Sequence, residues 1–108
     1  MATASFPNPT DPAAVDLQTA LAALADPVRR SIVRQLAAVP DWSLACGTFD
    51  LPVSKATSTH HFVVLRNAGL LDQRHEGRRS LNRLRRPEFD ERFPGLLDLV
   101  LADPDPGQ

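Results

Sequence analysis

Two adjacent histidines stand near the middle of the segment SKATSTHHFVVLRNAGLL, residues 54–71. Imidazole side chains can bind a metal ion, transfer protons or hydrogen-bond to a ligand. If this segment is helical, His60 and His61 point about 100° apart and do not converge on one ion. Two imidazoles are also too few for a closed zinc site, which normally takes four ligands. A metal would need a further ligand from a partner subunit, and we predict no metal site.

The same segment offers Ser54 and Ser58 as hydroxyl nucleophiles beside the histidines. Hydrolysis by such a pair would also need a pocket, an orienting carboxylate and an oxyanion hole. Nothing at a matching spacing supplies them. We therefore expect no catalytic residues, no enzyme activity and no cofactor.

Basic residues are concentrated in the middle of the chain. The net charge of the 108 residues is −1, which by itself argues against a nucleic-acid binder. Residues 54–86, however, hold eight of the twelve Lys and Arg residues and only two acidic ones, while the flanking segments are acidic. A polyanion would meet this segment rather than the average. The alternative is an ordinary solvated surface, but so uneven a distribution favours a functional basic face.

Length and composition indicate one domain with a modest core, since 43% of the 108 residues are apolar. The sequence has no transmembrane run and no signal peptide, and its one cysteine cannot form an internal disulfide. We expect a cytoplasmic protein with no membrane partner. Cys46 is interpreted as a buried structural thiol, with a redox role as the alternative. Trp42 is expected to pack beside the preceding helix or to line a small-molecule pocket.

Apolar periodicity, caps and breakers predict the elements that would position these residues. Asp26 with Pro27 predicts one helix start, Ser54 predicts another, and Gly77 predicts a hairpin turn. Pro94 lies inside the last helical pattern and could split it. The predicted helices are near 13–25, 27–39, 43–49, 55–68 and from 87 to about 102, with strands at 70–75 and 79–85.

This order predicts a mostly α (α+β) fold, a winged helix-turn-helix with five helices and a two-stranded β-hairpin wing between the fourth and fifth. The predicted domain covers residues 13–102. Residues 1–12 are expected to form a flexible arm, and residues 103–108 a flexible tail.

Three stretches, LAALADPVRRSIVRQLA, SKATSTHHFVVLRNAGLL and RHEGRRSLNRL, resemble in order the second helix, the recognition helix and the wing of ArsR/SmtB-type bacterial transcriptional regulators. The similarity covers about residues 17–101. It implies a homodimeric repressor with its first and last helices at the dimer interface. It also implies a recognition helix in the major groove and an inverted-repeat operator.

The sensing motifs of that family are not matched. Arsenic-type members carry a Cys-x-Cys pair where this chain has only Cys46, and zinc- or nickel-type members carry histidines in the last helix, where this chain has none. A metal- or thiol-responsive sensor repressor therefore stays an alternative, and any small-molecule effector is unidentified. An alternative of another class is a winged-helix protein-interaction module that binds through its last helix.

The predicted contacts follow from these assignments. The small and polar side chains of the recognition helix suit readout of base edges in the major groove, and arginines near the wing tip suit phosphates or a narrow minor groove. A charged edge that deters aggregation is the alternative for the wing. The predicted DNA-contacting residues are Ser54, Lys55, Ala56, Thr57, Thr59, His60, His61, Arg66, Arg74, Arg78 and Arg79. We expect His60 to reach a base edge or phosphate, and His61 to pack at the helix margin or contact phosphate. The predicted dimer interface comprises Leu17, Leu21, Phe89, Phe93, Leu97 and Val100.

Overall fold

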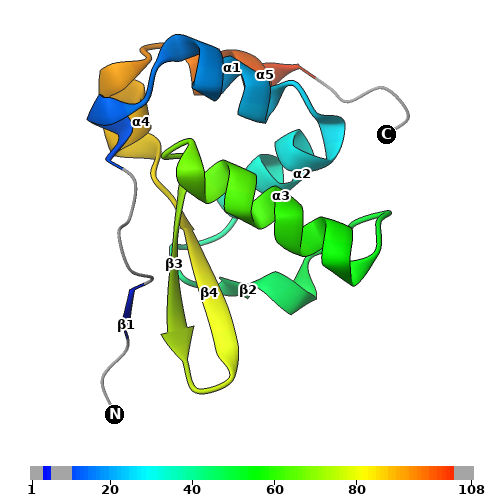
Figure 1. Ribbon diagram of the computed structural model, residues 1–108. Coiled ribbons are helices and arrows are strands. Elements are labelled where there is room, and N and C mark those ends of the chain that lie inside the picture. Colours follow the sequence, from blue (N-terminus) through cyan, green and yellow to red (C-terminus); the bar gives the residue numbers. More distant parts are fainter. Residues whose placement is uncertain (1–3, 6–10, 104–108) are drawn as a thin grey trace.

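Three short polar side chains fix where the long helices begin. Asp16, Asp26 and Ser54 each accept a hydrogen bond from a backbone N–H in the first turn of the helix that follows. The helices are α1 (Leu17–Leu24), α2 (Pro27–Ala37) and α3 (Lys55–Asn67). The starts predicted for the helices at 27 and 55 are confirmed in this computed structural model, which describes residues 4–5 and 11–103 (Figure 1).

The helix predicted near 13–25 is interrupted. Its first turn is a separate 3-10 helix, η1 (Pro12–Ala14), and α1 starts only after Val15 and Asp16 adopt extended backbone. Pro12 is buried against Gly69. Gly69 lies just after the end of α3 and has a φ of +74°. An added Cβ at Gly69 would lie 3.0 Å from the Pro12 Cα, so the close approach requires glycine. The predicted arm and tail lie largely outside the described residues.

The wing is confirmed as a hairpin of β3 (Leu71–Glu76) and β4 (Arg79–Leu84), with Gly77 at φ +64° in the turn. Two short strands extend it to a sheet of order β1-β3-β4-β2. They are β1 (Ala4–Ser5) and β2 (Leu44–Ala45), both antiparallel to their neighbours. The prediction of a two-stranded wing is therefore incomplete, because the hairpin belongs to a four-stranded sheet.

The prediction of a short helix near 43–49 is wrong. Leu44 and Ala45 pair with Asn82 and Leu81 of β4, and only a 3-10 turn, η2 (Cys46–Thr48), follows. The last predicted helix is split at Pro94 and Gly95 into α4 (Arg86–Arg92) and α5 (Leu96–Ala102). Five α-helices are thus present in the described residues, but the wing lies between the third and the fourth.

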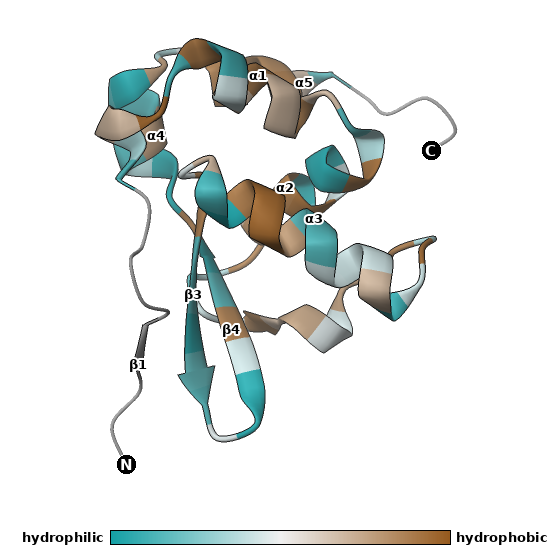
Figure 2. Ribbon diagram, viewed as in Figure 1, coloured by the Kyte–Doolittle hydropathy of each residue, from teal (hydrophilic) through white to brown (hydrophobic). Residues whose placement is uncertain are grey.

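The core lies where the long helices meet the base of the wing and the last two helices (Figure 2). It includes Phe89, Phe93, Leu97 and Val100, each at most 9% exposed. These four were predicted at the dimer interface; they instead fill the protomer's own core. Among residues 11–103, the large apolar side chains that stay exposed are Leu17, Leu21 and Leu99. None of the helices within 4–5 and 11–103 could cross a membrane.

Candidate nucleic-acid interface

The first half of α3 presents a continuous polar surface. Its exposed side chains are those of Lys55, Ala56, Thr57, Thr59 and His60, and Ser54 is exposed at the cap. Phe62 and Leu65 are buried and fix the opposite face of the helix in the core. The Thr59 hydroxyl donates to the Lys55 carbonyl at 3.0 Å, which leaves its oxygen lone pairs and its methyl group available. The predicted outward orientation of this face is confirmed.

His61 does not share that surface. It is 6% exposed, and Arg29 Nη1 lies 3.1 Å from its Nδ1. Since a guanidinium can only donate, Nδ1 accepts and the imidazole is neutral with its proton on Nε2. Burial lowers the pKa of His61; the nearby Asp26 opposes this, while the Arg29 and His60 charges lower it further. The DNA contact predicted for His61 is therefore wrong, and its packing alternative is correct.

Three arginines of α2 donate hydrogen bonds to backbone carbonyls of other helices. Arg29 Nε donates to the Ala23 carbonyl at 2.6 Å, and Arg30 donates to the Leu24 carbonyl at 2.8 Å. Arg34 donates to the Val100 carbonyl at 3.1 Å. These carbonyls belong to the last turns of α1 and α5, where helical partners are missing. The guanidinium groups thus hold the helical layer together.

The wing tip is basic and exposed. Arg78 and Arg79 flank the turn and have no ion-pair partner among residues 4–5 and 11–103. The outer half of the hairpin is strongly hydrophilic in Figure 2. Glu76 lies directly opposite Arg79 in the hairpin register, so within the described part of the chain the two arginines exceed the acidic charge of the tip by one.

Arg74 lies further back on β3. Its guanidinium carbon is 4.2 Å from the ring centroid of Trp42, a cation–π contact. Its Nε is buried and has no hydrogen-bond partner among residues 4–5 and 11–103. Trp42 itself has a φ of +63°, unusual for a residue other than glycine. Trp42, at the junction after α2, thus packs on the wing, and Arg74 is sheltered instead of reaching out from the tip.

The basic residues at the base of the wing are neutralised locally. Arg83 and Arg85 both contact Asp72 and Glu88, with nitrogen–oxygen distances of 2.5–3.6 Å. Hydrogen bonds from Arg83 lower the pKa of Glu88 to about 2. Arg86 is likewise paired with acidic residues of α4 and α5. The positive charge that remains for a polyanion is therefore concentrated on α3 and the wing tip.

A buried polar cluster connects α3 to the wing. Arg66 donates to Gln73 Oε1 at 2.5 Å, and Gln73 Nε2 lies 3.0 Å from both Cys46 Sγ and Asn82 Oδ1. Asn82 is fully buried and donates to the Leu44 carbonyl at 3.0 Å. Arg66 is thus engaged within the protein, and sequence reasoning missed this cluster, because nothing local marks Gln73 and Asn82 as partners.

Cys46 belongs to this cluster. Burial raises the pKa of its thiol, although bonds with Asn82 and Gln73 oppose the shift. A raised pKa leaves little thiolate at neutral pH, so the thiol is a weak nucleophile. Across the described residues, no group of three or more His, Cys, Asp or Glu side chains is arranged to hold a metal ion.

No protein-family model matches the sequence. Among curated proteins, the chain is similar to YceK of Bacillus subtilis (strain 168), an uncharacterised HTH-type transcriptional regulator. The two are 36% identical over 80 residues, which span 72% of this chain and 79% of the relative.

The two neighbouring histidines should differ in their effect on stability. The folded protein holds His61 neutral with a lowered pKa, whereas the unfolded chain takes up a proton near pH 6.5. The free energy of unfolding should therefore fall as the pH drops below about 6.5. His61→Gln, which can still accept from Arg29, should flatten this dependence in urea titrations between about pH 5.5 and 7.5. His60→Gln, on the exposed side, is the matched control and should retain most of the wild-type slope, because burial is the largest cause of the lowered His61 pKa and the His60 charge is a smaller one. Equal slopes for all three proteins would contradict the assignment.

Proposed function

This chain belongs to the HTH-type transcriptional regulators, and from that premise we propose that it is a homodimeric repressor of the ArsR/SmtB type. It binds an inverted repeat in double-stranded DNA, with α3 in the major groove and the wing beside it. The observation that carries the proposal is the separation of charge. Basic side chains elsewhere bond to helix carbonyls or to Gln73, pair with carboxylates or lie over aromatic rings, whereas Lys55, Arg78 and Arg79 form no ion pair in the described part of the chain.

The side chains of α3 suit the reading of base edges. His60 can donate to a purine N7 or O6, Thr59 can accept from a base amino group, and the Ala56 methyl can contact a thymine methyl. Lys55 and the wing arginines suit phosphates, which fix orientation without reading sequence. Readout is thereby assigned to α3, and positioning to the wing together with Lys55 at the start of α3.

An exposed apolar face supports dimerisation. Leu17 and Leu21 of α1 are about half exposed, and Leu99 of α5 is 70% exposed. Leu17 and Leu99 line one shallow groove together with Phe93 and Leu96. A second copy that covers this face would bury apolar surface and present two recognition helices to successive major grooves. The proposed interface keeps α1 and the last helix, but its members are Leu17, Leu21, Leu96 and Leu99.

The two kinds of DNA-binding residue should respond differently to mutation. His60→Ala should cost about 1–3 kcal/mol on the preferred site and little on scrambled DNA, because it removes a hydrogen bond to a base edge. The double change Arg78→Ala and Arg79→Ala should weaken binding to both DNAs. It should also reduce the dependence of log affinity on log salt by about one unit for each phosphate that the protein no longer neutralises. Fluorescence anisotropy with matched and scrambled duplexes at several salt concentrations measures both effects.

Arg86→Ala is the charge-matched control, since Arg86 is already paired with Asp90 and Asp98. It should leave the salt dependence close to that of the wild type. If His60→Ala weakens binding to matched and scrambled DNA equally, α3 does not read sequence and this part of the proposal is wrong.

Two leucines of α5 separate dimerisation from folding. Leu99→Asp should leave the protomer folded but raise the dimer dissociation constant at least about a hundredfold, because each dimer then lacks two buried leucine side chains that contribute roughly 1.5–3 kcal/mol each. Leu97→Asp, which places a charge in the core, should instead unfold the chain. Sedimentation velocity and circular dichroism distinguish the cases. A Leu99→Asp protein that sediments like a wild-type dimer would rule out this interface.

A further inference from the structure

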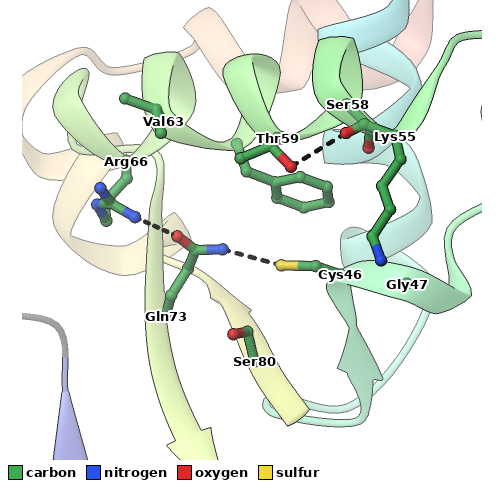
Figure 3. Close-up of a pocket in the computed structure, with 10 residues that line it drawn as sticks. Cys46, Gly47, Lys55, Ser58, Thr59, Val63, Arg66, Gln73 and Ser80 are labelled. Carbon is green, nitrogen blue, oxygen red and sulfur yellow. Dashed lines mark hydrogen bonds between the residues drawn. The ribbon is translucent and has the colours of Figure 1, made fainter. Parts of the chain in front are cut away.

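A cavity of about 310 Å³ lies between α3 and the inner face of the wing (Figure 3). This is at the lower end of the range for small-molecule pockets, about 300–1,000 Å³. Its walls come from α3, from η2, and from β3 and β4. The predicted DNA-contacting residues Lys55, Thr59 and Arg66 are among them.

The spacing of these side chains gives the cavity two cationic ends and an apolar middle. Positions 55, 59, 62 and 66 follow one face of a helix. In Figure 3, Lys55 extends from α3 toward Gly47 at one end, and Arg66 lies at the other end beside Gln73. Phe62 lines the cavity between them.

The polar groups are oriented for a negatively charged guest. Gln73 directs its NH₂ at Cys46 and Asn82, so its carbonyl oxygen faces Arg66 and aligns that guanidinium. No carboxylate is among the residues that line the cavity. The Lys55 ammonium has no ion-pair partner in the ranges 4–5 and 11–103. A neutral apolar guest would leave the Lys55 charge without a partner in the cavity, and a cation would be repelled.

We propose that this cavity binds a small flat organic monoanion, an aromatic carboxylate, and that its occupancy weakens DNA binding. The ring lies against Phe62 and Val63, and the carboxylate is held by Lys55 or Arg66. Because Lys55 and Thr59 also belong to the proposed DNA-reading face, guest and DNA compete for them. The second half of this inference rests on the proposed function, whereas the first half stands on the cavity alone.

The probe is 2-naphthoate, and 2-naphthamide is its uncharged control of the same shape. Titration of the full-length ¹⁵N-labelled protein, without DNA, should shift amide resonances of η2, α3 and β3. The apparent dissociation constant should be near 1 mM or tighter, and the amide should bind at least about tenfold more weakly, since it lacks the charge that strengthens the hydrogen bond to the carboxylate.

Gly47→Leu tests the location. Gly47 lines the cavity, and a Cβ added there meets no atom within 4 Å, so a larger side chain can be placed at this position without moving the backbone. Naphthoate binding should be lost in Gly47→Leu and weakened in Lys55→Gln. It should be unchanged in Arg78→Gln, a matched loss of charge at the wing tip. Equal binding of naphthoate and naphthamide, shifts centred on the Leu99 groove, or no binding at about 1 mM would overturn the site.

Competition between naphthoate and DNA is measured in a separate experiment. Saturating naphthoate should raise the dissociation constant of the DNA complex for the wild type but not for Gly47→Leu. Guest binding with no change in DNA affinity would overturn the competition while leaving the site in place. A protein that binds naphthoate but no DNA would instead contradict the proposed function.

Discussion

The wing is held against α3 by two buried amide side chains. Gln73 and Asn82 are directly opposite each other on β3 and β4 and are at most 4% exposed. Their hydrogen bonds reach β2 through Leu44, η2 through Cys46 and α3 through Arg66. A buried polar group left without a partner costs about 1–3 kcal/mol, so the hairpin cannot slip or tilt without breaking several such bonds. In the proposed DNA complex, a fixed angle between α3 and the wing would let one rigid surface meet both the major groove and the adjacent backbone.

The distribution of arginine partners determines which charges face outward. Guanidinium groups of α2 are directed at open carbonyls of α1 and α5, and those at the wing base are paired with Asp72 and Glu88. These pairs join helices to one another and α4 to the sheet. What remains exposed is a small basic surface on α3 and the wing tip, although the net charge of the chain is −1. The same cationic helix face borders the cavity beneath it, which physically links the two proposed binding events.

Local signals in the sequence predicted the elements that depend on local chemistry. Asp26, Pro27, Ser54 and Gly77 each set a helix start or a turn, and the structure agrees with all of them. Features that depend on distant partners were missed. Residues 44–45 form a strand only because β4, far along the chain, pairs with them.

The apolar pattern of the last helices shows a similar limit. It does not reveal which face the protomer covers itself, so core residues such as Phe89 were assigned to the dimer interface. His61 could have been recognised as buried, because it shares a helical stripe with Leu65 and Ala68. Its hydrogen-bond partner Arg29, which lies on another helix, could not have been identified from the sequence.

The central claim is that the exposed face of α3 enters the major groove of a two-fold operator. Dimethyl sulfate protection on the genomic fragment bound most tightly tests it directly, because the reagent methylates guanine N7 in the major groove and adenine N3 in the minor groove. We expect protection of guanine N7 in two clusters whose centres lie about 10 base pairs, or a multiple of that, apart. A stable complex that leaves every guanine N7 reactive would contradict it.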